Sequence, residues 1–382
     1  MWKILREYRN CFGSSRRLFA IPIGVALLTT LGLLALSSAS LSFVGQNYLL
    51  RQCLWLVVAI VFCAIAMALP LEFLRRHSLA IAIGAAALLI AVLIPAIGLS
   101  VNGSRRWINF KFFHFQVSEF AKIALLIRLA DRLADRSGME WDFRAGFFKP
   151  LIAIGTFSAL LIAEPDYGST VLFMLVGFAV MFLGGVPLRH LFICTAAAAV
   201  VVAIFIALNP LRLDRILSFL DIESTKLTGS YQLWQGLVGF QSGGLRGLGI
   251  GNGRQQLSYL PEAHTDFIFP VFAEELGYPF ALAVIFIYAA IFAVAWSEIY
   301  RIADPYLFLL SNGAILFVAA QTAINLAVVM GLFPTKGMAL PLISYGGSNL
   351  VLIFTLFGLL ANCLRTAHCQ KPRLEDLIGR HL

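Results

Sequence analysis

Charge is scarce in this chain of 382 residues. Asp, Glu, Lys and Arg together make up 13% of the sequence, whereas hydrophobic residues make up 60% and the mean hydropathy is +0.85. A water-soluble globule of this length needs more polar residues to cover its surface. The composition therefore excludes a soluble globular protein and predicts an all-α polytopic integral membrane protein.

Paired cysteine motifs are absent as well. The six cysteines are scattered through apolar segments and the tails without a Cys-x-x-Cys motif, so neither a disulfide framework nor a zinc site is predicted. The formal net charge is +9, but no basic module of the kind that binds nucleic acid is present. Most cations lie in short loops, where they set topology and contact anionic lipid. We therefore expect no nucleic-acid partner.

Long apolar runs fill most of the chain. A membrane-spanning helix needs about 20 apolar residues, and the sequence offers about ten such runs. They lie near residues 19–43, 48–70, 78–99, 116–130, 150–164, 166–185, 189–208, 267–297, 305–332 and 345–366. The expected organisation is a single membrane domain with a cytoplasmic tail at 1–18, helices one to seven over 19–208, a large extracytoplasmic loop at 209–266, helices eight to ten over 267–366 and a second cytoplasmic tail at 367–382.

The positive charges predict which side of the membrane each loop occupies. Cytoplasmic loops carry an excess of Lys and Arg, and most of the 29 cations fall in the tails and inner loops when both termini are cytoplasmic. The loops 100–116, 209–266 and 333–344 are then extracytoplasmic. We expect a multi-pass protein of the cytoplasmic (inner) membrane.

The first outer loop, residues 101–116, interleaves cations with aromatic residues. Arg105, Arg106 and Lys111 alternate with Trp107 and several Phe residues. Aromatic residues at headgroup level and cations on lipid phosphate make an interfacial anchor. The same residues suit a recognition surface for an anionic, lipid-linked ligand, and both interpretations place the loop against the headgroups.

Two charged residues open the fourth apolar run. Glu119 and Lys122 are three residues apart, so they share one face of a helix and can form an ion pair. Charged residues inside a membrane are costly and usually mark functional sites. A functional pair and a purely structural pair that holds neighbouring helices both fit the sequence.

A polar segment centred on Pro165 interrupts the apolar residues 150–185. Proline cannot continue a helical hydrogen-bond ladder, so two short helices are expected to meet at Asp166. Irregular backbone at membrane depth must be buried in protein or line a water-filled cavity. Asp166 is therefore either the corner of an outer turn or a carboxylate that lines a cavity.

The long outer loop ends in His264, Thr265 and Asp266, directly before the apolar Phe267. Charge at the rim of the hydrocarbon is costly unless a substrate path or a catalytic group uses it. Aspartate also caps helix N-termini well. Asp266 is therefore the cap of a helix that begins at Phe267, a functional carboxylate, or both.

Two further outer segments stand out. Residues 239–253 are rich in glycine, which permits close approach of backbone to a ligand, but no strand–turn–helix unit surrounds them and a nucleotide fold is excluded. Residues 334–348 form a compact loop that adds Lys336 and Ser344 to the outer face. Carboxylates beside cations at a membrane surface suit a reaction on a lipid-linked, phosphate-bearing substrate, and they equally suit a transport path.

A series of motifs runs in order along nearly the whole chain. They are Arg-Arg-Trp-Ile (105–108), Phe-Gln-Val-Ser-Glu-Phe-Ala-Lys (115–122), Glu-Pro-Asp-Tyr-Gly (164–168), Leu-Pro-Glu-Ala-His-Thr-Asp-Phe-Ile-Phe (260–269), Glu-Glu-Leu-Gly (274–277) and Leu-Pro-Leu-Ile-Ser-Tyr-Gly-Gly-Ser (340–348). Together they resemble the SEDS family (shape, elongation, division, sporulation). Residues 261–264 and 334–337 look more like its division-type FtsW/SpoVE branch than its elongation-type RodA branch, whereas Arg254-Gln255-Gln256 departs from the Gln-Lys pair common in the division type.

The resemblance implies a peptidoglycan glycosyltransferase with about ten transmembrane helices. It would polymerise lipid II at the outer face of the cytoplasmic membrane, for septal cell-wall synthesis in cell division. Its expected partners are lipid II, a class B penicillin-binding protein (a transpeptidase with a single transmembrane helix) and other divisome or elongasome proteins. A divalent cation, Mg²⁺ or Mn²⁺, is the candidate cofactor, and no organic cofactor is expected.

The resemblance also assigns site residues. It places the family's essential loop aspartate at Asp266, which we predict to be the catalytic general base. The predicted substrate-binding residues are Arg105, Arg106, Trp107, Lys111, Glu119, Lys122, Asp166, His264, Thr265, Lys336 and Ser344. The candidate metal ligands are Asp266, Asp166 and Glu119.

Two other functions fit the polar residues. A lipid II flippase would move lipid across the bilayer without making polymer, and it would not depend on Asp266. A non-catalytic division scaffold would only dock partner proteins. The resemblance favours the polymerase over both, and it favours the flippase over the scaffold.

Overall fold

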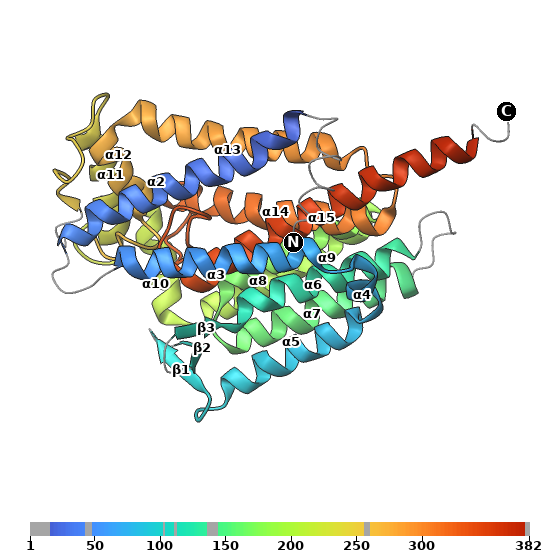
Figure 1. Ribbon diagram of the computed structural model, residues 1–382. Helices are drawn as coiled ribbons and strands as arrows, with labels where there is room; N and C mark the ends of the chain where they lie inside the picture. The colour runs from blue at the N-terminus through green and yellow to red at the C-terminus, as the bar shows by residue number, and fades with distance from the viewer. Residues whose placement is uncertain are drawn as a thin grey trace.

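The computed structural model describes residues 16–42, 48–101, 104–110, 113–135, 144–255 and 260–378. Long helices run roughly side by side across Figure 1 and form one bundle. The predicted class of helical polytopic membrane protein is therefore confirmed.

The elements follow in the order of the sequence. The helices are α2 (Ala20–Ser42), after the 3-10 turn η1 (Arg16–Phe19), α3 (Tyr48–Ala68), α4 (Leu71–Arg76), α5 (Ser78–Leu93), α6 (Val117–Ala134), α7 (Lys149–Ala163), after the π turn η2 (Arg144–Phe148), α8 (Tyr167–Leu183), α9 (Leu188–Ala207), α10 (Pro210–Leu220), α11 (Tyr231–Gly243), α12 (Ile268–Leu276), α13 (Tyr278–Ile299), α14 (Pro305–Val329) and α15 (Gly347–Ile378). The strands are β1 (Gly98–Val101), β2 (Ser104–Phe110) and β3 (Phe113–Gln116).

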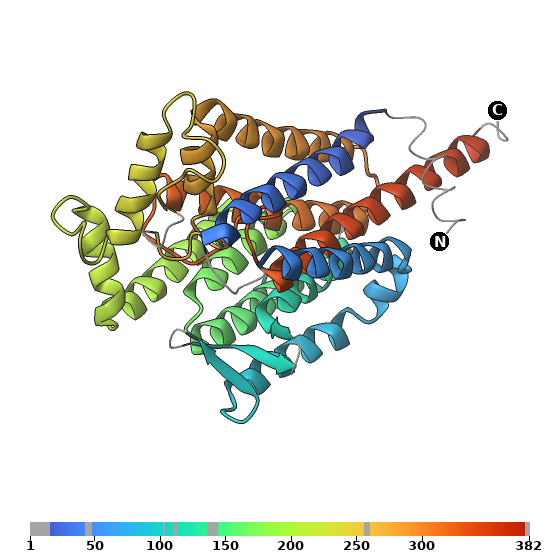
Figure 2. The ribbon, with the colours of Figure 1, turned by 60° about the vertical axis from the view of Figure 1, so that its left-hand side comes forward.

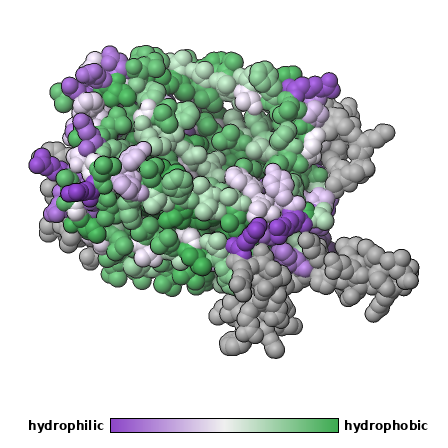
Figure 3. Space-filling view, turned by 90° about the horizontal axis from the view of Figure 1, so that it is seen from above, coloured by the Kyte–Doolittle hydropathy of each residue, from purple (hydrophilic) through white to green (hydrophobic). Residues whose placement is uncertain are grey.

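An apolar belt surrounds the bundle. Among the described residues, seven helices are long and apolar enough to cross a membrane, and α5 and α8 are shorter apolar helices. On α9, Phe192 is 76% exposed and Ile193 is 64% exposed, as lipid-facing side chains are. Figure 3 shows hydrophobic residues in green over most of one face, with hydrophilic residues in purple near its left and right ends. A bilayer requires such a belt, so the chain is a multi-pass membrane protein.

Helix α6 lies inside the bundle. It contacts α5, α7, α8, α14 and α15, and most of its residues are buried. Leu125, Leu129 and Ala130 are fully buried. The neighbouring helices shield the charged residues of α6 from lipid, which is where intramembrane charges are normally found. The helix that carries Glu119 and Lys122 is thus enclosed by protein.

Irregular structure gathers at one end of the bundle, on the left in Figure 1. The sheet and helices α10, α11 and α12 lie there, and the C-terminal end of α15 lies at the opposite end. Figure 2 shows the same division from another direction. The sheet has the order β1-β2-β3, with antiparallel pairing throughout. The outer loops 100–116 and 209–266 therefore share one end, as the charge distribution predicts.

Three features differ from the sequence-based expectation. The loop 100–116 forms a small sheet in a chain expected to be all-α, and the loop 209–266 contains α10 and α11. The expectation of one helix over 267–297 is wrong, because α12 and α13 meet at Gly277. Gly277 has a φ of 85°, and a Cβ there would lie 2.8 Å from the backbone oxygen of Leu245. The break between α12 and α13 thus depends on a contact with a segment distant in the sequence. The length of an apolar run gives no information about such a contact.

Glycine at a helix contact gives a test of the packing. Gly358 of α15 faces α3, and a Cβ added there would lie 2.6 Å from the Cys63 carbonyl oxygen and 3.1 Å from its Cα. Since backbone atoms of α3 have little room to shift, we expect Gly358→Ala to lower the free energy of unfolding by about 1–3 kcal/mol. Thermal unfolding in detergent measures this loss.

Gly155→Ala in α7 is the matched control. No atom lies within 4 Å of the added Cβ, and alanine has the higher helix propensity, so stability should stay the same or rise slightly. A loss as large as that of Gly358→Ala would contradict the packing described for α15 and α3.

Candidate functional site

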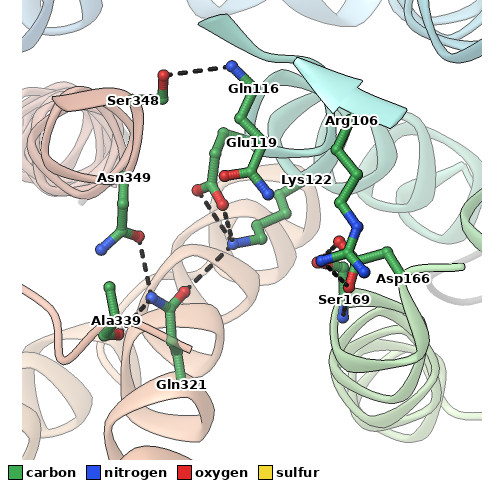
Figure 4. A network of polar contacts seen from close by, with 10 residues as sticks. All are labelled: Arg106, Gln116, Glu119, Lys122, Asp166, Ser169, Gln321, Ala339, Ser348 and Asn349. Atoms are coloured by element: carbon green, nitrogen blue, oxygen red, sulfur yellow. Dashed lines mark hydrogen bonds and ion pairs between the residues drawn. The ribbon is translucent and has the colours of Figure 1, made fainter. Parts of the chain in front are cut away.

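A β-bulge aims Arg106 at the break between α7 and α8. The register of β1 with β2 shifts between Leu99 and Ser100, which leaves Arg106 as the extra residue on β2. Bulges bend a strand, redirect a side chain and are common beside functional sites. Arg106 Nη1 lies 3.6 Å from Asp166 Oδ1 (Figure 4). Its Nη2 donates to the Pro165 carbonyl oxygen at 2.7 Å.

Asp166 stands at the N-terminus of α8. Its Oδ1 accepts a hydrogen bond from Ser169 N at 3.1 Å, and its Oδ2 accepts one from Ser169 Oγ at 2.8 Å. The residue is 5% exposed. Asp166 is therefore the cap of α8 at the break between two helices and also a buried carboxylate that pairs with Arg106. Its lining of a cavity stays a prediction.

Arg212 of α10 joins the same group, although it was not among the predicted residues. Its guanidinium carbon lies 3.5 Å from the centre of the Tyr167 ring, in cation–π contact, and its Nη2 donates to the Pro165 carbonyl oxygen at 3.3 Å. No sequence motif marks Arg212, because only the tertiary fold brings α10 to the start of α8.

Lys336 reaches the same place from the loop that follows α14. A Cβ added at Gly168 would clash with Lys336 Cε, and it would lie 2.9 Å from Lys336 Nζ and 3.4 Å from Asp166 Oδ1. Burial lowers the pKa of Lys336 to about 8, and the charge of Asp166 opposes this shift. Lys336 thus lies over Gly168 beside Asp166.

The neighbouring Glu164 is fully buried. Neither of its carboxyl oxygens has a hydrogen-bond partner within the described ranges. Burial, followed by the charge of Asp166, raises the pKa of Glu164 to about 8, so near pH 7 it is mostly protonated. Arg106, Arg212 and Lys336 then surround a single charged carboxylate. We call these three residues the cation cluster, and its excess of positive charge suits an anionic ligand.

The predicted ion pair on α6 forms. Lys122 Nζ donates to Glu119 Oε1 at 2.9 Å and to Oε2 at 3.0 Å, and it donates to Gln321 Oε1 of α14 at 3.2 Å (Figure 4). Lys122 is 2% exposed and Glu119 is 7% exposed. A buried pair is stable only when its remaining hydrogen-bonding positions are satisfied. The charge of Lys122 is therefore compensated inside the bundle.

Asp266 lies half-buried in the turn before α12. The helix begins at Ile268 with Phe267 at its N-cap and without a side-chain cap, so the interpretation of Asp266 as the cap is wrong. A Cβ added at Gly337 would lie 2.8 Å from Asp266 Oδ2, which places this carboxylate beside the residue that follows Lys336. Burial, followed by the charge of Glu262, raises the pKa of Asp266 to about 7. Such a group can accept a proton at neutral pH.

Hydrogen bonds join the turn that carries Asp266 to the loop before α15. Ser344 Oγ donates to the Thr265 carbonyl oxygen at 2.6 Å, and Tyr345 N donates to the His264 carbonyl oxygen at 3.0 Å. Burial also lowers the pKa of the His264 imidazole. Ser344, Thr265 and His264 thus hold the turn, and their contact with a substrate stays a prediction.

The glycine-rich segment packs against α12. Glu274 accepts hydrogen bonds from Arg254 N at 3.1 Å and Gln255 N at 3.0 Å, and Glu275 accepts one from Gly251 N at 3.1 Å. Both glutamates are buried. The sequence suggested that the backbone of this segment approaches a ligand. In the described part of the segment, the backbone instead approaches helix α12.

The remaining predicted residues lie in the first outer loop. Arg105 and Trp107 are half-buried on β2, whereas Lys111 lies outside the described residues. Their roles in substrate binding stay predictions.

The candidate metal ligands fall in separate groups. Glu119 is bound by Lys122, and Asp166 is bound by Ser169 and Arg106, while Asp266 lies in another loop. In the part of the chain that the structure describes, no three His, Cys, Asp or Glu side chains lie together so that they could hold a metal ion. These residues therefore do not fit a metal ion held by the protein alone.

The fold and the site define a polytopic membrane protein with buried carboxylates and cations at one end of its bundle. The chain belongs to the cell cycle protein family of FtsW, RodA and SpoVE, whose model matches residues 19–368. This membership confirms the resemblance seen in the motifs.

Several relatives are similar over most of the chain. A probable peptidoglycan glycosyltransferase FtsW from Pseudomonas fluorescens is 37% identical over 353 residues, which cover 90% of this chain and 86% of the relative. One of the same name from Tolumonas auensis is 40% identical and covers 79% of each chain.

Two solved structures share the fold. A chain from a peptidoglycan synthase complex that coordinates polymerization and crosslinking aligns with a TM-score of 0.76 at 27% identity, over 91% of this chain and 98% of its own. The rod shape determining protein RodA of Thermus thermophilus aligns with a TM-score of 0.69 at 24% identity, over 91% and 97%. The RodA comparison supports the fold alone.

Substitutions at Asp166 separate its two structural roles. Asp166→Asn keeps an oxygen that can accept from Ser169 N but loses the charge toward Arg106, whereas Asp166→Ala loses both. Loss of a cap costs about 1 kcal/mol, and an unpaired buried partner adds to this loss. Thermal unfolding in detergent should therefore show a lower midpoint for the alanine variant than for the asparagine variant.

Ser169→Ala is the control for this pair, because it removes the hydroxyl but keeps the backbone donor of the cap. Its midpoint should stay closer to the wild type than that of Asp166→Ala. An alanine variant as stable as the wild type would show that Asp166 does not hold the α7–α8 break.

Proposed function

We propose that this chain is a peptidoglycan glycosyltransferase that polymerises lipid II into glycan strands at the outer face of the membrane, for septal wall synthesis in cell division. Relatives named as probable peptidoglycan glycosyltransferases cover most of the chain. The observation that carries the proposal is Asp266, a half-buried carboxylate with a pKa of about 7 beside Gly337. Lys336, which directly precedes Gly337 in the sequence, belongs to the cation cluster.

Asp266 would act on the acceptor sugar. Chain growth joins the 4-hydroxyl oxygen of an acceptor N-acetylglucosamine to C1 of a donor N-acetylmuramic acid. Asp266 takes the hydroxyl proton as the new bond forms, and the bond between C1 and the pyrophosphate oxygen breaks. A single displacement of this kind inverts an α donor to a β linkage. The polyprenyl pyrophosphate leaves with the electron pair.

The cation cluster would act on the leaving group. Its members Arg106, Arg212 and Lys336 provide positive charge in a partly buried place, where charge developing on pyrophosphate is stabilised more strongly than in water. Lys122 was also predicted to bind the substrate, but its ammonium group is enclosed by Glu119 and Gln321. We therefore assign Lys122 a structural role, in which it holds the helices around the site together and does not bind the pyrophosphate.

The proposal extends to partners and location. We propose a class B penicillin-binding protein with a single transmembrane helix as the partner, together with other divisome or elongasome proteins, in the cytoplasmic (inner) membrane. The structural match to a chain of a peptidoglycan synthase complex supports this. A divalent cation, Mg²⁺ or Mn²⁺, remains a prediction. Mg²⁺ commonly binds through substrate phosphates with only one or two carboxylates, but we assign no step to it.

Polymerisation of purified lipid II in proteoliposomes, with the cognate penicillin-binding protein present, tests the function. Asp266→Asn keeps the shape of the side chain but removes the base, so product formation should fall about 10²–10⁴-fold while KM stays near the wild-type value. Glycan chains resolved on a gel give the measurement.

Glu72→Gln is the matched control, because it makes the same chemical change at an exposed residue of α4, away from the site. It should polymerise at the wild-type rate. Translocation of labelled lipid II without polymer, unaffected by Asp266→Asn, would favour a flippase. Neither activity in the wild type would favour a scaffold.

The pH dependence of polymerisation follows from two pKa values. Asp266 has to be deprotonated, so the rate should rise with pH through about 7, and Lys336 has to be charged, so the rate should fall through about 8. Arginine stays charged across this range. Glu164 in the same cluster also has a pKa of about 8, so the comparison is made in a Glu164→Gln background. When Lys336→Arg is added there, the falling limb should move to higher pH while the rising limb stays in place. A falling limb that stays near pH 8 in this variant would contradict the assignment of Lys336.

A further inference from the structure

A buried glutamine on α14 connects parts of the site that come from different segments. Gln321 is 4% exposed, and its Oε1 accepts a hydrogen bond from Lys122 Nζ at 3.2 Å. Its Nε2 donates to the Ala339 carbonyl oxygen and to Asn349 Oδ1, each at 2.9 Å (Figure 4). One side chain therefore joins three segments: helix α6, helix α15 and the loop that follows α14.

The partners fix the orientation of this amide. An ammonium group only donates and a backbone carbonyl oxygen only accepts. The Gln321 oxygen must therefore face Lys122, and its nitrogen must face Ala339. A flipped amide would place two donors together and two acceptors together, so one arrangement alone satisfies both contacts.

Asn325 repeats the connection one helical turn further along. It is 2% exposed, and its Nδ2 donates to the Asp266 carbonyl oxygen at 2.9 Å and to the Met338 carbonyl oxygen at 2.6 Å. Residues four apart lie on the same face of a helix. Gln321 and Asn325 thus hold two successive carbonyl groups, those of Met338 and Ala339.

The segment held in this way carries the chemistry of the site. Lys336 and Gly337 directly precede Met338, and Gly337 lies against the carboxylate of Asp266. Replacing the Gln321 amide by an apolar group would leave the Ala339 carbonyl oxygen and Lys122 each with one partner fewer. The loop and the ion pair would then lose their shared contact.

We infer that Gln321 is a positioning residue that couples the Glu119–Lys122 ion pair to the loop carrying Lys336 and Gly337, and thereby sets the place of Lys336 and Asp266 for the reaction. The inference rests on the proposed polymerase function for its kinetic consequence. The coupling itself is a property of the fold that is measurable without substrate.

Gln321→Met tests the coupling, because methionine matches the length of glutamine and makes no hydrogen bond of comparable strength. The matched control is Thr322→Val on the same helix. Thr322 is 2% exposed, and among the residues that the structure describes its hydroxyl donates only to the Val318 carbonyl oxygen of the same helix. Both variants remove a buried polar group, but only Gln321→Met breaks contacts between segments.

Hydrogen–deuterium exchange gives the readout that needs no activity. In Gln321→Met, exchange of peptides covering residues 334–344 should increase, whereas in Thr322→Val it should match the wild type. Polymerisation kinetics give the second readout. Since a misplacement of about 1 Å can cost about 10²-fold in rate, we expect kcat to fall about 10-fold to 100-fold in Gln321→Met with KM little changed.

The outcomes separate the two proposals. Increased exchange with reduced kcat in Gln321→Met, and neither change in Thr322→Val, supports the inference. Unchanged exchange, or increased exchange with wild-type kcat, overturns it. If the wild type itself makes no glycan, the proposed function fails, and the exchange data still decide whether Gln321 couples the segments.

A second variant covers a loss of folding. If Gln321→Met has a much lower unfolding midpoint than Thr322→Val in a thermal scan, Gln321→Glu takes its place. Glutamate keeps an acceptor toward Lys122 but loses the donor to the Ala339 carbonyl oxygen and to Asn349 Oδ1. The same increase in exchange over residues 334–344 and the same fall in kcat are expected. Wild-type values for both in Gln321→Glu would overturn the role of the Ala339 contact.

Discussion

The buried ion pair of α6 is the constraint on which the arrangement of the bundle depends. Removing two charges from water costs several kcal/mol per ion, and the pair repays this only with good geometry and with additional hydrogen bonds. Glu119 and Lys122 obtain both because α5, α7, α8, α14 and α15 enclose α6. That enclosure leaves α9 and much of α3 at the lipid face. It also brings together the ends of the central helices that lie nearest the sheet, and there the loops form the site.

Where the loops at this end are buried against the helices, water cannot reach their backbone groups, which therefore need hydrogen-bond partners within the protein. Side chains from the helices supply the missing partners. Asn325 holds the carbonyl oxygen of Asp266, Ser344 holds that of Thr265, and Glu274 holds the amides of Arg254 and Gln255. Residues that resemble ordinary structural polar groups thus fix the position of Asp266. The chemistry proposed for the carboxylate depends on their precise placement, since a general base must meet its proton at hydrogen-bond distance.

Local features of the site were predictable from the sequence, and features that depend on distant contacts were not. The spacing of Glu119 and Lys122 indicates an ion pair, and Pro165 indicates a helix break at Asp166, because both follow from local backbone geometry. Asp266 stands out as a charge at an apolar border, although its role as a helix cap was wrong. Arg212 and Gln321 carry no such signal, since only the packing of α10 and α14 brings them to the site. The small sheet was missed because its strands are short and its residues also suit an interfacial loop.

We propose that catalysis takes place at the end of the bundle that carries the sheet and helices α10, α11 and α12. The most direct measurement confines lipid II to one leaflet of proteoliposomes in which the protein has a single known orientation, and then follows glycan formation. Polymer is expected when lipid II is in the leaflet next to that end, and none is expected over the same period when lipid II is in the other leaflet. Equal polymer from both leaflets, or polymer only from the leaflet beside the C-terminal end of α15, would show that catalysis does not take place at the end that carries the sheet.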